Sequence, residues 1–210
     1  MISVSALTAN AQLSLANPDD APKNTLTPQS FVNGLAATVQ VQPAAATSVY
    51  AGNILATFGS ASFIMYCVDL FSTATLGTST LYKQGLVATS PQSIELSKLF
   101  TADNGAAANG AVNSAALQLA IWEVLYDPNP ISVLTGSFTA DVTPETATRA
   151  NWLLNQRATV TPNYQLTLFT DMGMSNNQDF ISATPIPEPS MLLMLGLGLV
   201  AVTALTRVKK

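Results

Sequence analysis

One glutamine and one cysteine are the side chains of this sequence best suited to joint chemistry. Gln118 lies within 114–126, where Leu117, Ile121 and Leu125 recur at helical spacing and predict an amphipathic helix. Helical geometry places Gln118 at the edge of the apolar face, half buried, where an unpaired amide costs roughly 1–3 kcal/mol. We hypothesise that its partner is Cys67, the only cysteine of the chain, and that the two residues are joined covalently.

Missing residue types exclude several classes of site. The chain has no histidine, which excludes Ser-His-Asp and Cys-His nucleophilic systems and histidine-ligated metals. A single cysteine forms neither an intrachain disulfide nor a thiolate metal cluster, so we expect no metal and no cofactor. The net charge is −4 without a basic patch, and phosphate binding needs clustered Lys and Arg. Nucleic acid is therefore not expected as a partner.

The composition indicates one exported domain with appendages. The chain has 210 residues, of which 48% are hydrophobic and only 10% are charged. Soluble domains usually carry about 25% charged residues, so the polar surface here must consist of Ser, Thr, Asn and Gln. Such a surface is more common in exported proteins than in cytosolic ones.

The pattern along the chain predicts an α+β fold: a β-rich domain with a few short helices. Helices are expected to open at Ser90-Pro91 and Thr143-Pro144, because each pair places a capping side chain before a proline. Asn113 or Ser114 is expected to cap the central helix, and Asp127-Pro128 to end it. Strands are predicted at Leu35–Val41, Tyr50–Phe58, Ser62–Leu70, Leu81–Val87 and Tyr164–Phe169.

Composition divides the chain into four parts. Residues 1–11 contain Ala9-Asn10-Ala11, which has the form of a signal-peptidase site but no apolar segment before it. They are either an ordinary terminus or, as we expect, the remnant of a truncated signal peptide. The β-rich domain is expected over 12–175, a polar Pro-rich spacer over 176–190, and a hydrophobic helix with a basic end over 191–210.

The C-terminal segment is suited to a membrane. Met191–Thr206 carries no charge and is followed by Arg207, Lys209 and Lys210. Sixteen helical residues rise about 24 Å, slightly less than the ~30 Å hydrocarbon core, and the flanking residues make a span feasible. The basic end would stay in the cytoplasm and the domain would lie outside. The alternative is a buried C-terminal helix, although no polar face marks it.

The tail resembles the PEP-CTERM sorting signal of Gram-negative bacteria. Pro187, Glu188 and Pro189 form the Pro-Glu-Pro motif, and the hydrophobic segment and basic cluster follow in order. The resemblance implies export, anchoring in the inner membrane through 191–206, and recognition by an exosortase, which is thought to cleave near the motif. The processed protein would then reach the cell surface or the extracellular matrix, in company with exopolysaccharide and biofilm systems. Such tails are also labelled ice-binding protein C-terminal domains, but nothing in these residues indicates ice binding.

A second resemblance covers roughly residues 50–127. Tyr66-Cys67-Val68-Asp69 and the later Leu117–Trp122 are similar to the Cys and Gln motifs of bacterial thioester domains, best known from Gram-positive surface adhesins. The resemblance implies that the Cys67 sulfur and the Gln118 side-chain carbonyl join, with loss of ammonia, into an internal thioester. Leu117 stands where many such motifs have Thr. The partner would be an amine-bearing molecule of unknown identity.

Three neighbours are candidate surroundings of this bond. Tyr66 and Trp122 would form walls, and Asp69 would polarise or orient the reacting groups. The alternatives are that both aromatic side chains belong to the core and that Asp69 accepts hydrogen bonds in a turn.

We therefore expect an exported protein that captures a nucleophile covalently and, as a single-use reagent, is not an enzyme. The alternative is a non-covalent structural protein of the exopolysaccharide matrix in which Cys67 is simply buried. A hydrolase that uses Asp69 or Glu123 as acid or base lacks a visible second group.

Overall fold

The structure is a computed structural model that describes residues 13–104, 110–127, 129–172 and 177–187. Its helices and strands, in chain order, are β1 (Lys23–Val41), β2 (Thr47–Phe58), β3 (Ala61–Cys67), β4 (Thr80–Leu86), α1 (Pro91–Ala102), α2 (Ala111–Tyr126), β5 (Phe138–Asp141), α3 (Pro144–Gln156), β6 (Tyr164–Asp171) and β7 (Phe180–Pro185).

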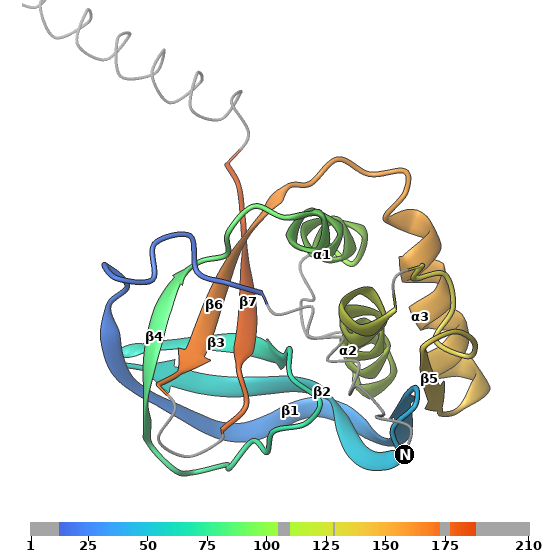
Figure 1. Cartoon of the computed structure of the whole chain (residues 1–210), viewed down its shortest axis with the longest axis horizontal. Helices are drawn as coiled ribbons and strands as arrows, with labels where there is room; N and C mark the ends of the chain where they lie inside the picture. The colour runs from blue at the N-terminus through green and yellow to red at the C-terminus, as the bar shows by residue number, and fades with distance from the viewer. Residues whose placement is uncertain (1–12, 105–109, 128, 173–176, 188–210) are drawn as a thin grey trace, which may run out of the picture.

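The strands form a closed antiparallel barrel. Hydrogen bonding runs β1–β2–β3–β7–β6–β4 and returns from β4 to β1, so the ring of strands is closed. Closure removes the unpaired strand edges that would otherwise template aggregation. The three helices lie together at one side of the barrel (Figure 1). This arrangement confirms the predicted β-rich fold with a few short helices.

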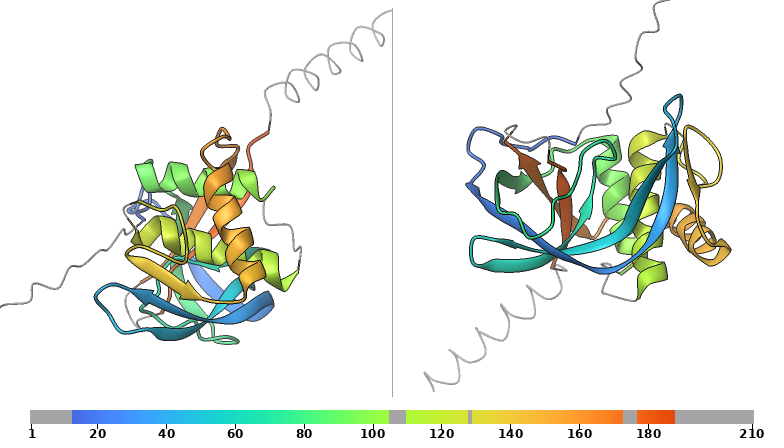
Figure 2. Two further views of the ribbon diagram at one scale, coloured as in Figure 1. Left: turned by 90° about the vertical axis from the view of Figure 1, so that its right-hand side faces the viewer. Right: turned by 90° about the horizontal axis from the view of Figure 1, so that it is seen from below.

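β1 and β2 are longer than the barrel requires. Their antiparallel register continues out to Val39 opposite Thr47, and β5 adds to the far end of β1 through Thr38–Val41. This extension, which we call the hairpin arm, reaches past the barrel and along the helices (Figure 2). α2 contacts β1, β2 and β5, so it packs against these strands.

α2 is the central element of the helical layer and contacts β1, β2, β5, α1 and α3. Every residue from Ser114 to Tyr126 is buried, so the predicted single apolar stripe is wrong. Partners on all sides explain the difference, because Ala115, Ala116 and Leu119 on the remaining faces are also apolar enough to be buried.

The structure agrees with three of the four predicted helix ends. Ser90 and Thr143 cap α1 and α3, each followed by proline, and α1 has a reciprocal capping box between Ser90 and Ser93. α2 ends at Tyr126, as expected. The N-cap of α2 is Gly110 rather than Asn113 or Ser114, because its φ of 91° lets the chain turn into the helix earlier.

β7 corrects the predicted domain boundary. The predicted Pro-rich spacer over 176–190 includes residues 180–185, but these residues pair with both β3 and β6 and complete the barrel. Phe180 and Ile181 are fully buried in the core. The domain therefore extends at least to Pro185. β5 was not predicted either.

Two predicted segments lie outside the described residues. These are the signal-peptide remnant at 1–11 and the hydrophobic helix with its basic end at 191–210, together with Glu188 and Pro189 of the motif. Within the described ranges, no helix is both long enough and apolar enough to cross a membrane.

A carboxyl group is buried within α2. Glu123 has no exposed surface; its Oε1 accepts a hydrogen bond from the Ser132 backbone N–H at 3.4 Å, and its Oε2 has no hydrogen-bond partner among the described residues. Burial, followed by the nearby Asp127, raises the pKa of Glu123 to about 8. The side chain is therefore largely protonated in the folded protein at neutral pH.

We predict that this carboxyl group makes the fold less stable as the pH rises. Its pKa is about 8 when folded and near 4.5 otherwise, so its contribution is complete below pH 4.5 and is lost as the pH rises towards 8. Glu123→Gln should remove this loss and raise the free energy of unfolding at pH 8 by about 1–3 kcal/mol. Urea unfolding at several pH values measures both proteins.

The window between pH 6 and 8 isolates Glu123, because burial raises the pKa of Asp179 only to about 6. Parallel pH dependences of the wild type and the Gln variant across that window would contradict the prediction.

Candidate functional site

The candidate site is built where β3 leaves its partner β2. The β2–β3 ladder runs from Ala61 to Met65 and stops there, whereas Tyr66 and Cys67 pair with Ile181 and Phe180 of β7 on the other side. The backbone groups of Cys67 that face β2 are therefore left without a strand. Since Cys67 is 4% exposed, water does not readily replace the strand.

The side chain of Gln118 takes the place of the missing strand. The Cys67 backbone N–H donates a hydrogen bond to Gln118 Oε1 at 2.9 Å, and Gln118 Nε2 donates one to the Cys67 carbonyl at 2.8 Å. Gln118 is fully buried, not half buried as predicted. The amide that was predicted to need a partner thus has one in Cys67, through the backbone of that residue.

A close approach of β1 and β2 accompanies this gap. Gly34 and Gly52 face each other, and a Cβ atom on Gly52 would lie 2.2 Å from the Asn33 carbonyl oxygen. Beside them the β1–β2 register shifts between Phe31 and Asn33, and the Asn33 N–H donates to the side chain of Asn53 at 2.9 Å. Only glycine allows this approach of the two backbones.

α2 contacts the end of β3 at a second point. Gln118, Trp122 and Tyr126 recur every four residues and form one ridge of the helix. The Tyr126 hydroxyl accepts a hydrogen bond from the Leu70 N–H at 3.1 Å and donates one to the Val68 carbonyl at 3.3 Å. The ridge thus holds the chain at Cys67, Val68 and Leu70.

A pocket of about 410 Å³ opens over this site. Cys67 and Trp122 are both part of its wall, whereas Gln118 is not, so a molecule in the pocket would reach Gln118 past these two side chains. None of the described lining residues carries a charge; they are Phe31, Thr47, Ser48, Val49, Tyr50, Cys67, Leu70, Phe71, Ser72, Thr73, Ala74, Trp122 and Gln178.

The two aromatic residues expected as walls are placed differently. Trp122 lines the pocket, is 2% exposed, and its indole N–H lacks a hydrogen-bond partner within the described residues. Tyr66 does not line the pocket, because successive side chains of a strand point to opposite faces. It packs edge-to-face against Phe100 of α1, and burial, followed by the charge of Asp103, raises the pKa of its hydroxyl.

Asp69 shapes the rim of the pocket. Its Oδ1 accepts a hydrogen bond from the Phe71 N–H at 2.8 Å, and its Oδ2 accepts a short one from Ser72 Oγ. Its carbonyl accepts a short hydrogen bond from Gln178 Nε2. Asp69 therefore holds a turn, the alternative that the sequence left open, and orients residues 70–73 above Cys67.

Sequence reasoning missed Tyr126, Phe71 and Gln178. Tyr126 could have been found, because it is a polar aromatic residue two helical turns after Gln118 on the same ridge. Phe71 and Gln178 belong to irregular segments whose meeting depends on β3 and β7 pairing, for which the sequence has no local signal.

The surroundings keep the Cys67 thiol protonated. Burial, followed by the negative charge of Asp69, raises the pKa of Cys67 well above its ordinary value. A free thiol here is a poor nucleophile towards outside reagents, because the thiolate is the reactive form. Chemistry at Cys67 therefore depends on groups already in contact with it.

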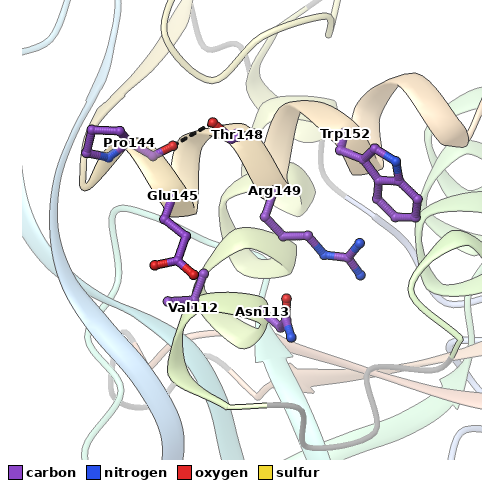
Figure 3. A pocket seen from close by; sticks show the side chains of 7 residues that line it. All are labelled: Val112, Asn113, Pro144, Glu145, Thr148, Arg149 and Trp152. Carbon is purple, nitrogen blue, oxygen red and sulfur yellow. Dashed lines mark hydrogen bonds between the residues drawn. The ribbon is translucent and has the colours of Figure 1, made fainter.

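A second pocket, of about 490 Å³, lies between α3 and the start of α2 (Figure 3). Arg149 lies over the Trp152 ring, 4.2 Å from its centre, and donates to Asp103 at 2.6 Å. The ion pair ties α3 to Asp103, the C-cap of α1. The pocket shares no lining residue with the one over Cys67 and contains none of the predicted site residues.

Comparison with known proteins identifies the tail. Residues 185–210 match the PEP-CTERM protein-sorting motif, which confirms the resemblance of this segment. The motif implies export, membrane-associated sorting and processing by an exosortase. No curated protein matches the chain in sequence.

Solved structures similar to this chain include two of the N-terminal thioester domain of a surface protein from Clostridium perfringens. One has 14% sequence identity and a TM-score of 0.46, and it covers 72% of this chain and 100% of the other. The second, a cysteine-to-alanine mutant, has 12% identity and a TM-score of 0.46, with coverage of 71% and 99%.

Proposed function

We propose that this exported protein attaches covalently to an amine on a partner through an internal thioester between Cys67 and Gln118. The observation that supports it most is the reciprocal pair of hydrogen bonds between the Gln118 amide and the Cys67 backbone. They fix the acyl group beside the residue that carries the only thiol of the chain. Contact of this kind replaces a bimolecular encounter by a positioned one.

Formation of the bond requires no group other than the Cys67 thiol and the Gln118 amide. The Cys67 sulfur adds to the Gln118 side-chain carbon, the carbon–Nε2 bond breaks, and Nε2 leaves as ammonia with the thiol proton. The Cys67 N–H, which already donates to Oε1, would stabilise the negative charge that develops on that oxygen. The proton transfer is internal, so no histidine or carboxylate base is required.

The same surroundings would protect the bond until a partner arrives. Gln118 has no exposed surface, so water reaches the acyl carbon only past Cys67 and Trp122. An amine that enters the pocket would form an amide with the acyl carbon, break the carbon–sulfur bond and return its proton to Cys67. The reaction happens once per chain, so the protein is a reagent and not an enzyme.

A non-covalent structural role in an exopolysaccharide or biofilm matrix is the second candidate. It is favoured by the completeness of the hydrogen bonding, since Gln118 satisfies Cys67 without a covalent bond. The raised pKa of the thiol also suits an inert buried cysteine. Hydrolysis has weaker support, because the Asp69 carboxylate is engaged in a turn and Glu123 is buried away from the pocket.

The proposed location of the protein follows from the sorting motif in its C-terminal tail. The protein would come from a Gram-negative cell, be held in the inner membrane through residues 191–206, and reach the surface or matrix after exosortase cleavage. Adhesion there would follow from the thioester.

The intact mass of the chain tests the bond directly. The purified protein should be one ammonia lighter than its sequence, because thioester formation expels Nε2. Methylamine should then add its full mass and free the Cys67 thiol. Cys67→Ala should show full mass and no methylamine adduct. A wild-type chain of full mass, with Cys67 alkylated only after unfolding, would support the packed alternative instead.

Stability measurements provide a second test. A bond between residues 51 positions apart would stabilise the fold by about 4 kcal/mol through loop entropy. Cys67→Ala removes this constraint but keeps both hydrogen bonds of the Gln118 amide, one of which the thioester loses with Nε2, so it should cost roughly 2–3 kcal/mol in urea unfolding. Adding Gln118→Leu should cost roughly a further 1–3 kcal/mol by leaving buried backbone groups unpaired. A cost of about 1 kcal/mol for Cys67→Ala would match the loss of a small packed side chain.

Processing of the tail is tested by changing the motif. In a host that contains the exosortase, the wild-type chain should lose its hydrophobic segment and leave the membrane fraction. Glu188→Ala should retain the full mass and remain in that fraction, and Glu145→Ala, a change in an exposed helix, serves as the matched control. Equal processing of all three chains would show that the Pro-Glu-Pro motif is not required for cleavage.

A further inference from the structure

The wall of the pocket over Cys67 combines aromatic rings with unused hydroxyl groups. Phe71 is 64% exposed and Tyr50 is 43% exposed, although both are large aromatic residues. Each is held by a neighbouring ring: Phe71 lies edge-on to Tyr126 at 5.8 Å, and Tyr50 lies 4.2 Å from Phe31. Rings that are both fixed and exposed beside a pocket are suited to stack on a flat ligand face.

The hydroxyl groups are available to the same ligand. The side chains of Thr47, Ser48 and Thr73 line the pocket and make no hydrogen bond to any other described residue. Hydroxyls both donate and accept, so they match a ligand that itself carries several hydroxyl groups. Aromatic faces and hydroxyls together suit a sugar ring, which has an apolar C–H face and a polar rim.

The uncharged lining of the pocket over Cys67 restricts which amines can react there. No charged side chain is present among the described lining residues, and the chain contains no histidine. The nearest carboxylate is Asp69 at the rim, and it already accepts hydrogen bonds from the Phe71 N–H and the Ser72 hydroxyl. The lining side chains therefore offer no base to deprotonate an ammonium group. A lysine side chain, with a pKa near 10.4, is almost entirely protonated at neutral pH, whereas an amine with a pKa near 8 is partly neutral.

We infer that the amine which this site accepts belongs to an amino sugar, an inference that rests on the proposed thioester. Electron-withdrawing hydroxyl and ring oxygen atoms make such an amine weakly basic, so it enters the pocket in its neutral form. Its nitrogen forms an amide bond with the acyl carbon of Gln118, the carbon–sulfur bond breaks, and the amine proton passes to the Cys67 sulfur. Hydroxyl groups of the same sugar do not react, because no base activates them.

The test follows adduct formation on the full chain by intact mass at pH 7, with separate small amines. Glucosamine should react about tenfold faster than glycinamide, a weak amine without hydroxyls, because only the sugar uses the pocket wall. It should react more than a hundredfold faster than Nα-acetyl-lysine amide, whose amine is mostly protonated. N-acetylglucosamine, which lacks a free amine, should give no adduct.

Variants locate the selectivity in the wall. Phe71→Ala should lower the ratio of the glucosamine rate to the methylamine rate about fivefold, since it removes the exposed ring. Ile131→Ala, which removes an apolar side chain of similar exposure outside the pocket, should leave the ratio unchanged. An unchanged ratio in Phe71→Ala would overturn the inference.

The outcomes separate this inference from the function on which it rests. If methylamine reacts but glucosamine is no faster than glycinamide, the thioester stands and the amino-sugar assignment is wrong. If methylamine fails to react and the chain has its full mass, the thioester itself is absent, and the assignment fails with it.

Discussion

The exchange of hydrogen bonds between the Gln118 amide and the Cys67 backbone is the constraint on which the site depends. The ladder of β3 with β2 ends at Met65, so Cys67 would otherwise bury an unpaired N–H and carbonyl. Each such group costs roughly 1–3 kcal/mol when unpaired. A side chain from α2 supplies both partners, which fixes the position and the rotation of the helix against the end of β3.

This constraint requires a helix that is buried on every side. The barrel supplies one wall, α1 and α3 supply others, and the hairpin arm of β1 and β2 covers what remains. The same burial excludes water from Gln118 and raises the pKa values of Cys67 and Glu123. Dryness at the site is thus a property of the whole helical layer and not of a local lid.

The sequence predicted features that depend on neighbouring residues, such as helix ends, but not features that depend on contacts between distant segments. The caps at Ser90 and Thr143 and the end of α2 were predictable, because hydroxyl and proline geometry acts within one helical turn. The full burial of Gln118 was not, since the hairpin arm that covers α2 is remote in sequence. β7 was missed because the prolines around it indicated a spacer, although its pairing with β3 and β6 outweighs them.

Some residues of the candidate site could likewise be predicted from the sequence, and others could not. Cys67 and Gln118 were paired by their motifs, and the structure brings the Gln118 amide onto the Cys67 backbone. Tyr66 was expected beside them, but the alternation of a strand turns it to the opposite face, towards Phe100. The pocket rim could not be predicted, because Phe71 and Gln178 come together only through turns that Asp69 organises.

Burial of the thiol determines how the proposed chemistry can proceed. A pKa raised this far makes free thiolate a rare species, both as the attacking group and as the leaving group. Each step must therefore move a proton together with the bond: from sulfur to the departing ammonia when the thioester forms, and from the incoming amine to sulfur when it opens. Neither transfer needs an external base, which is consistent with a chain without histidine and a pocket whose described wall is uncharged. It also makes the partner's own basicity decisive, because only an amine that arrives neutral has both the lone pair and the proton that the step consumes.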